Sequence, residues 1–281
     1  MPKIVLIMRE RRENAVRPPR TIVTACVLAA ALLVAGCGGR TVSRPVAQAV
    51  LQPLAAEGPD PFTASTATVP LAVTRSAQAT PPAQNSPLPG VGPAAPAGPR
   101  TVSGGTPGLY GGAARVGSCD VERQIGYLTA DPARERAFAR AEGIPEASVP
   151  GYLRRLTPVV LRADTRVTNH GYRDGGAARF QSVLQAGTAV LVDDRGLPRV
   201  RCACGNPLRP PAAQEGAASM ARHTGGGGAW PGYRPAEVVV VTPAPRAVTS
   251  ITIVDVQSHG WVERPIGHDV GRDRLVSAPG G

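Results

Sequence analysis

Apolar residues recur at helical spacing between residues 118 and 156, where the pattern predicts three short helices. The apolar positions of the first helix share one face, and they are Val121, Ile125 and Leu128. Asp131 followed by a proline predicts the start of a second helix, and Gly143 predicts its end. A third helix is expected from about 149 to 156. Short helices of this kind need a larger surface on which to bury their apolar faces.

The period of the apolar positions changes to two after Thr157, which predicts strands. The expected strands cover 159–161, 165–168, 180–184, 188–192 and 199–202. Asp193 to Gly196 has the composition of a hairpin turn, and the stretch 205–207 is expected to end the sheet. Two later apolar runs, 237–242 and 249–256, predict a hairpin. A two-stranded hairpin is barely stable alone, so it should dock on the main sheet, beside a first strand at 46–54.

These elements together predict an α+β fold with disordered insertions. Short N-proximal helices (about 118–156) would be followed by a small antiparallel β-sheet or a partly open barrel. Gly and Pro make up 33 and 30 of the 281 residues, and they concentrate in a few stretches. Such stretches bury too little apolar surface to fold. Disorder is therefore expected at about 75–108, at about 209–229 and in a tail at 271–281, which leaves one domain over 46–270.

The first 36 residues have the layout of a bacterial export signal. Five arginines between residues 9 and 20 precede an apolar run from Thr21 to Ala35, which is too short to span a bilayer comfortably. The sequence Leu-Val-Ala-Gly-Cys that ends at Cys37 resembles the lipobox of lipoproteins. The resemblance implies cleavage before Cys37 and acylation of that cysteine, with palmitate-type chains, so that residues 37–45 link a membrane anchor to the domain.

Part of the basic charge belongs to the predicted export signal. The formal net charge is +11, but residues 1–36 contain six of the 31 cations and two of the 20 acids, so the mature chain would carry +7. The arginines are scattered among acids, and aromatic residues are only 4% of the chain. Nucleic-acid binding needs a basic patch with stacking aromatics. We therefore expect no nucleic-acid partner, and an anionic envelope polymer stays a candidate ligand.

Three cysteines remain after the signal and the lipid site are removed. Cys119, Cys202 and Cys204 would lie outside the cytoplasm, where disulfides form. A bond between Cys202 and Cys204 would be strained, so Cys119 is expected to pair with one of them, preferably Cys202, with Cys204 as the alternative. The chain contains no Cys-x-x-Cys, and its four histidines lack ligand spacing, so neither a metal nor another cofactor is expected.

The densest polar cluster lies at residues 169–175. Its functional side chains would be those of Asn169, His170, Tyr172, Arg173 and Asp174. A loop of this composition could bind a ligand or hold His170 as a general base, although such loops are more often simple turns. No nucleophile elbow, phosphate-binding loop or zinc-protease motif accompanies it. The cluster is kept as a candidate binding loop, and no catalytic residue is assigned.

Several motifs resemble those of a family of bacterial exported lipoproteins that carries a domain of unknown function. They are Gly58-Pro-Asp-Pro-Phe-Thr63, Gly117-Ser-Cys-Asp120, Thr157-Pro-Val-Val-Leu-Arg162, Thr165-Arg-Val-Thr-Asn-His-Gly171, Val200-Arg-Cys-Ala-Cys-Gly-Asn-Pro-Leu208 and Trp230-Pro-Gly-Tyr233. The resemblance runs from about residue 46 to 262. It implies that the first strand belongs to the domain, and it brings no activity and no catalytic residues.

Two functional hypotheses follow from the sequence. The first is a lipid-anchored module on the extracytoplasmic face of the cell membrane, which binds an envelope polymer or a protein partner without catalysis. The alternative is an extracytoplasmic enzyme that acts on envelope material with the His170 loop. A pocket that joins His170, Arg173 and Asp174 would favour the enzyme, and a groove without aligned acid and base groups would favour the binding module.

Overall fold

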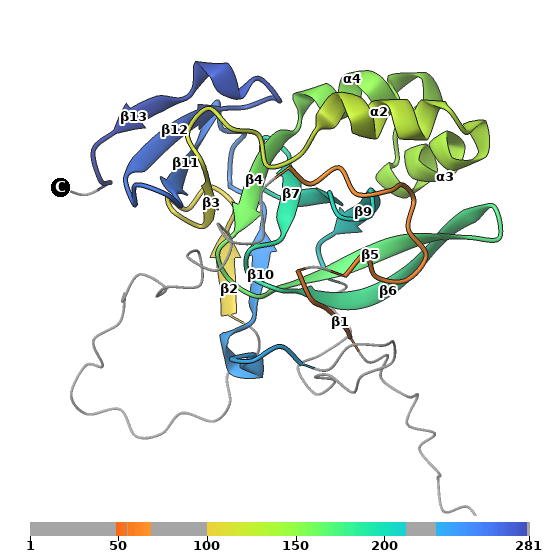
Figure 1. Cartoon of the computed structure of the whole chain (residues 1–281), viewed down its shortest axis with the longest axis horizontal. Coiled ribbons are helices and arrows are strands. Elements are labelled where there is room, and N and C mark those ends of the chain that lie inside the picture. The colour runs from red at the N-terminus through yellow and green to blue at the C-terminus, as the bar shows by residue number, and fades with distance from the viewer. Residues whose placement is uncertain (1–48, 55, 69–99, 212–228, 280–281) are drawn as a thin grey trace, which may run out of the picture. The chain divides into compact units, whose positions relative to one another are not determined.

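The computed structural model describes residues 49–54, 56–68, 100–211 and 229–279 (Figure 1). All of them belong to one unit, Pro45–Gly281. The predicted signal peptide, Cys37 and the linker 37–45 lie outside the described residues, as do most of the two predicted insertions, over 69–99 and 212–228. No helix within the described ranges is long and apolar enough to cross a bilayer.

Three short α-helices lie together on one side of the sheet (Figure 1). They are α2 (Val121–Thr129), α3 (Pro132–Glu142) and α4 (Val149–Arg155). The Asp131 carboxylate accepts hydrogen bonds from the backbone amides at the start of α3, and Gly143 ends that helix with a φ of 65°. The three helices predicted between 118 and 156 are thus present.

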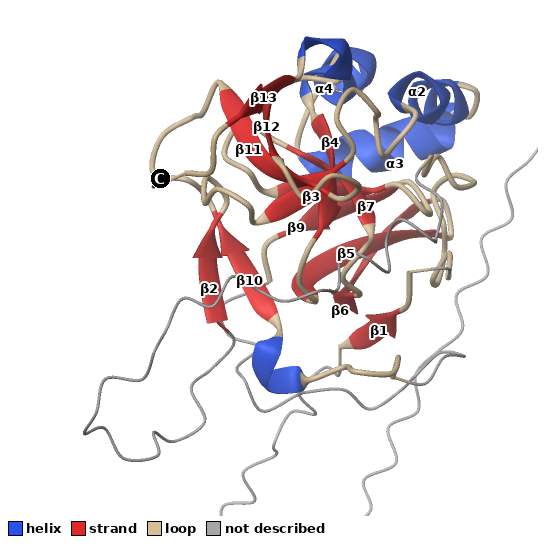
Figure 2. Ribbon diagram, turned by 60° about the vertical axis from the view of Figure 1, so that its left-hand side comes forward, coloured by secondary structure: helices blue, strands red, loops and turns tan. Residues whose placement is uncertain are grey.

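The strands form one 13-stranded sheet of mixed direction, in which most neighbouring pairs are antiparallel and β1–β6, β10–β2, β10–β5 and β11–β3 are parallel. The main path runs β1-β6-β5-β9-β8-β7-β4-β3-β11-β12-β13, and β10 and β2 branch from β5 (Figure 2). The strands are β1 (Val50–Gln52), β2 (Arg100–Ser103), β3 (Tyr110–Gly112), β4 (Thr157–Leu161), β5 (Thr165–Arg173), β6 (Gly176–Leu184), β7 (Ala189–Val192), β8 (Pro198–Arg201), β9 (Asn206–Arg209), β10 (Val239–Thr242), β11 (Ser250–Asp255), β12 (Trp261–Pro265) and β13 (Arg274–Val276).

This architecture corrects the predicted fold class, which is wrong. The protein is mostly β, with a large mixed sheet in place of the small antiparallel sheet or partly open barrel. The stretch 205–207 does not end the sheet, because Asn206 begins β9. The predicted hairpin of 237–256 is also absent: β10 pairs with β2 and β5, and β11 pairs with β12 and β3.

Two regions predicted to be disordered contain strands. Residues 100–103 form β2 within the predicted insertion 75–108, and residues 274–276 form β13 within the predicted tail. Both strands are short and contain no buried residue, so they carry almost no apolar pattern of their own. Their partners β10 and β12 supply the hydrogen bonds that hold them in the sheet.

The sheet is buried on both faces near its centre. In β7, Ala189 and Leu191 join the apolar cluster under the helices, while Val190 and Val192 join a second cluster with β11 and β12. Every residue of this strand is buried, which explains its unbroken apolar sequence. The first cluster contains Phe62, the aromatic residue of the Gly58–Thr63 motif, at 1% exposure. The Gly58–Thr63 motif therefore packs against the helices through Phe62.

Candidate functional site

The predicted binding loop at 169–175 is a β-hairpin. Asn169 to Arg173 belong to β5, and they pair in register with β6 as far as Arg173 opposite Gly176. Asp174 and Gly175 form the two-residue turn, with φ values of 50° and 75°. Positive φ at both central residues is the geometry that Asp-Gly favours in a hairpin. The expectation of a loop is therefore wrong over 169–173.

The polar side chains of this hairpin are engaged in separate structural contacts. Asn169 is fully buried, donates to Gln52 Oε1 at 2.8 Å and accepts from Asn206 Nδ2 at 3.0 Å. Arg173 pairs with Asp60 at 2.6 Å. The Tyr172 ring packs 5.4 Å from that of Phe62. These contacts tie β5 to the chain around the first motif.

His170 is half-buried, and its Nδ1–H donates to the carbonyl of Pro207 at 3.2 Å. Burial lowers the pKa of His170 below its ordinary value of 6.5, and the charges of Arg209 and Arg179 lower it further. A carboxylate does not appear among the groups that shift it. Within the described ranges, His170 thus lacks the acidic partner that orients a catalytic base in a triad.

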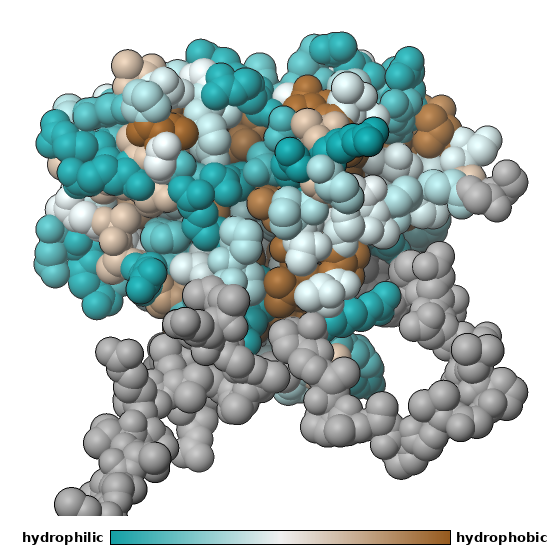
Figure 3. Space-filling model, turned by 180° about the vertical axis from the view of Figure 1, so that it is seen from behind, coloured by the Kyte–Doolittle hydropathy of each residue, from teal (hydrophilic) through white to brown (hydrophobic). Residues whose placement is uncertain are grey.

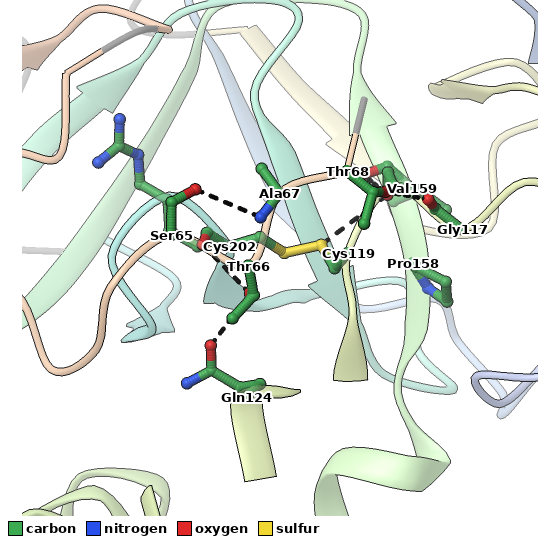
Figure 4. Close-up of a disulfide and its surroundings, with 12 residues drawn as sticks. Ser65, Thr66, Ala67, Thr68, Gly117, Cys119, Gln124, Pro158, Val159 and Cys202 are labelled. Carbon is green, nitrogen blue, oxygen red and sulfur yellow. Dashed lines mark hydrogen bonds between the residues drawn. A yellow bond between two sulfur atoms is a disulfide. The ribbon is translucent and has the colours of Figure 1, made fainter. Parts of the chain in front are cut away.

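Cys119 and Cys202 form a disulfide, as the preferred pairing predicted (Figure 4). The chain at 65–68 runs beside it: the Thr66 amide donates to the Cys202 carbonyl at 2.8 Å, and the Thr66 hydroxyl donates to Gln124 Oε1 at 3.2 Å. Cys204 is a free, buried thiol, and Arg201 Nη1 lies 3.5 Å from its sulfur. The disulfide joins the start of α2 to the end of β8, so its place is structural.

A pocket of about 430 Å³ opens where α4, the β7–β8 turn and the chain after β12 meet. Its lining residues are Tyr152, Arg154, Arg155, Leu156, Asp193, Asp194, Arg199, Ile266 and Gly267. The volume is within the usual range for small-molecule sites. Asp193 is positioned by the predicted hairpin turn, where its Oδ1 accepts from the amides of Arg195 and Leu197, both at 2.9 Å. The pocket is not lined by His170, Arg173 or Asp174.

Two lining residues, Tyr152 and Arg199, belong to a polar network with the buried Glu142. Tyr152 Oη donates to Glu142 Oε2 at 2.8 Å and accepts from Arg199 Nε at 2.9 Å, and Arg199 Nη2 donates to the same carboxylate oxygen at 2.8 Å. Burial raises the pKa of the Glu142 carboxyl, and the charge of Arg199 opposes that rise. Burial and Glu142 both raise the pKa of the Tyr152 phenol. Tyr152 therefore keeps its proton, which its hydrogen bond to Glu142 requires.

The charged side chains at the mouth of the pocket differ in whether they have an ion-pair partner. Arg154 pairs bidentately with Glu122, at 2.8 and 2.7 Å. Arg155 and Asp194 are both exposed, and neither side chain has an ion-pair or hydrogen-bond partner among the described residues. A cation and an anion without partners in the described part of the chain therefore line the same pocket.

The sequence patterns did not predict this pocket. Asp193 and Asp194 were interpreted as hairpin residues in preference to paired carboxylates, and the Arg154-Arg155 pair at the end of a helix was given no role. The sequence did contain a local signal, because two adjacent arginines end one element and two adjacent aspartates follow another. Their meeting depends on the pairing of β4 with β7, which no local pattern specifies. No cluster of metal-ligating side chains occurs within the described ranges.

Comparison with known proteins gives a family and no activity. A search of curated proteins and a search of solved structures both found no match. The family model of a domain of unknown function (DUF6777) matches residues 100–267, which include the three helices, the disulfide and the pocket. This match covers more than half of the chain. The chain therefore belongs to the DUF6777 family, whose domain has no assigned function.

Proposed function

We propose that this protein is a lipoprotein anchored through Cys37 to the extracytoplasmic face of the cell membrane, and that its domain binds a cell-envelope polymer without catalysis. The pocket between α4 and the β7–β8 turn is the binding site. The observation that carries this proposal is the unpaired Arg155 guanidinium at the pocket mouth, which is available to an anionic group of the polymer.

The state of the other polar groups supports binding over catalysis. Tyr152 and Arg199 both bond to Oε2 of Glu142 and to each other, so that the network fixes the pocket wall. The lining contains no Ser, Cys or His that could serve as a nucleophile or a base at neutral pH. His170, the residue of the enzymatic alternative, is held against Pro207 elsewhere on the sheet.

The shape of the site favours a polymer over a protein partner. Stable protein interfaces bury on the order of 800 Å² per partner on a broad surface, whereas a pocket of about 430 Å³ encloses a small chemical group. On the face shown in Figure 3, apolar side chains surface as separate patches among hydrophilic ones. Small patches of this kind are common on any soluble domain.

The anchor sets how far the pocket can act from the membrane. Eleven residues lie between Cys37 and Ala49, the first described residue. A chain of that length reaches at most about 40 Å. A domain tethered so closely meets polymer in the layer next to the membrane, where a high local concentration compensates for weak binding.

Binding can be tested by sedimenting the full protein with insoluble cell-wall polymer from a lipoprotein-producing bacterium. We expect the protein to sediment with the polymer, and Arg155→Gln to reduce the bound fraction by about tenfold, because a charged hydrogen bond is lost. Arg140→Gln is the matched control, since Arg140 is exposed on α3 and does not line the pocket.

Three outcomes would overturn the polymer proposal. They are equal binding by wild type and Arg155→Gln, binding only to a protein extracted from the wall, and release of soluble wall fragments. Release of fragments that Arg155→Gln retains and His170→Ala abolishes would establish the enzymatic alternative instead.

Anchoring is tested separately with Cys37→Ser. We expect the wild-type chain in the membrane fraction, with a mass that includes the acyl chains, and the Cys37→Ser chain without them, because the sulfur is the site of attachment. Cys204→Ser is the matched control, since that thiol is buried in the domain. An unmodified Cys37 in membrane-bound protein would contradict the proposal.

A further inference from the structure

The pocket carries two charges of opposite sign that no residue of the described ranges pairs. Of the five charged side chains in its lining, three already have partners: Arg154 bonds to Glu122, Arg199 bonds to Glu142, and Asp193 accepts from backbone amides. Arg155 and Asp194 have no partner among the described residues. Because both are exposed, neither residue pays a desolvation cost until a ligand binds.

The two unpaired groups come from different elements. Arg155 is the last residue of α4, and Asp194 lies in the turn between β7 and β8. Each contributes to the lining of the same pocket, without a direct ion pair between them. Leu156 and Ile266 add apolar surface to that lining. The site therefore offers a cationic donor for a carboxylate, an anionic acceptor for an ammonium group and an apolar wall.

We propose that this pocket binds a zwitterionic amino-acid or short-peptide group. Its carboxylate pairs with Arg155, its ammonium group pairs with Asp194, and its aliphatic portion contacts Leu156 and Ile266. This inference names the ligand class of the proposed polymer-binding site, and it rests on that proposal. Peptide substituents of an envelope polymer supply this chemistry.

Charge complementarity separates this ligand class from the simpler ones. A purely anionic group would satisfy Arg155 but would lie beside the unpaired carboxylate of Asp194, and a purely cationic group would face Arg155. Like charges placed together weaken binding and act against the wrong partner. A zwitterion satisfies both residues at once. The pocket volume of about 430 Å³ accommodates a group of dipeptide size.

The test is calorimetric titration of the full protein in detergent with three matched probes. Alanyl-leucine carries both charges, its N-acetyl derivative lacks the ammonium group, and its C-terminal amide lacks the carboxylate. We expect alanyl-leucine to bind about tenfold more tightly than either derivative, because each derivative leaves one pocket charge unpaired. The D,D form of the dipeptide is titrated alongside, and binding of either stereoisomer supports the proposal.

Two variants test which pocket residue pairs with each charged group of the ligand. Arg155→Gln should weaken alanyl-leucine by about tenfold without weakening the amide, and Asp194→Asn should weaken alanyl-leucine without weakening the N-acetyl form. The matched controls are Arg140→Gln and Asp174→Asn, which alter exposed residues that do not line the pocket. Asparagine tolerates the positive φ at position 174, so that control keeps the hairpin.

Equal affinity for the three probes, or no binding of either dipeptide stereoisomer, would overturn the zwitterion inference. The wall-sedimentation experiment separates this failure from failure of the proposed function. Polymer binding that depends on Arg155 but is not accompanied by dipeptide binding refutes only the zwitterion. Dipeptide binding without polymer binding refutes the polymer and retains the ligand class.

Discussion

At the residue scale, some of the arginines that make the composition basic are buried and do not contribute to surface charge. Arg201 and Arg264 are both fully buried. Arg201 donates to the carbonyls of Pro53, Ala56 and Glu57, while Arg264 pairs with Asp273 at 2.6 Å and donates to the Pro158 carbonyl. A sequence count treats these residues as surface charge. Burial shows instead that they hold backbone segments in place, where five fixed donors are useful.

His170 provides a prediction at the same scale. Its pKa is lowered in the folded protein, so the unfolded chain binds the proton more readily. Stability is therefore lost as the pH falls below 6.5, and this loss is complete below the folded-state pKa. In His170→Gln, urea denaturation at about pH 7.5 and about pH 5 should show a smaller loss on acidification than in the wild type.

An NMR titration of the His170 ring should give a midpoint below 6.5. A His170 midpoint at or above 6.5, or identical acid sensitivity of the variant and the wild type, would contradict the prediction.

At the scale of the element, the long apolar strands and the helices were predictable, and the polar or short strands were not. The runs 157–161, 180–184 and 189–192 have clear β patterns and are strands. The polar half of β5 was interpreted as a loop, although the Asp174-Gly175 pair was a usable hairpin signal. β3 and β9 contain Gly111, Gly112 and Pro207, residues that weaken a strand prediction. β3 and β9 are strands because they pair with neighbouring strands of the sheet.

The disulfide gives a prediction for the contact between α2 and β8. Replacement of both Cys119 and Cys202 by alanine should lower the free energy of unfolding by about 4 kcal/mol, because the bond closes a long loop in the unfolded chain. Chemical denaturation measures this loss. Cys204→Ala is the matched control and should lose less, since it keeps the disulfide. Equal denaturation midpoints for the double variant and the wild type would contradict a stabilising role.

At the scale of the whole molecule, parallel pairs join segments that are distant in sequence. β1 pairs with β6, so Val50 lies opposite Ser182, and β10 pairs with β2, so Val239 lies opposite Arg100. Sequence analysis did place the strand near residue 50 in the domain, but it placed the 237–242 run beside it. Parallel pairing over such distances leaves no turn in the sequence to mark it.

The packing of residues 49–68 predicts that a cut chain stays together. A specific protease site inserted between residues 69 and 99 would separate β1 and the first motif covalently from the rest. We expect both fragments to co-elute in size-exclusion chromatography, also under reducing conditions, since Phe62 and the carbonyls bound by Arg201 hold them.

The same cut in an Arg201→Met chain is the comparison, because that variant loses the hydrogen bonds to residues 53–57. It should release the N-terminal fragment more readily. Separation of the wild-type fragments under native conditions would show that this segment does not contribute to the fold.

The sequence by itself determined the local features of this protein. Helix caps, the Asp193–Gly196 turn and the choice of Cys119 as a disulfide partner follow from the conformational preferences of a few adjacent residues. Tertiary structure alone decided the size and direction of the sheet, the burial of Arg201 and Arg264, and the meeting of Arg155 with Asp194 in one pocket. These features depend on pairings between distant segments. The free energy of such a pairing depends on both segments, so the local sequence of either one does not specify it.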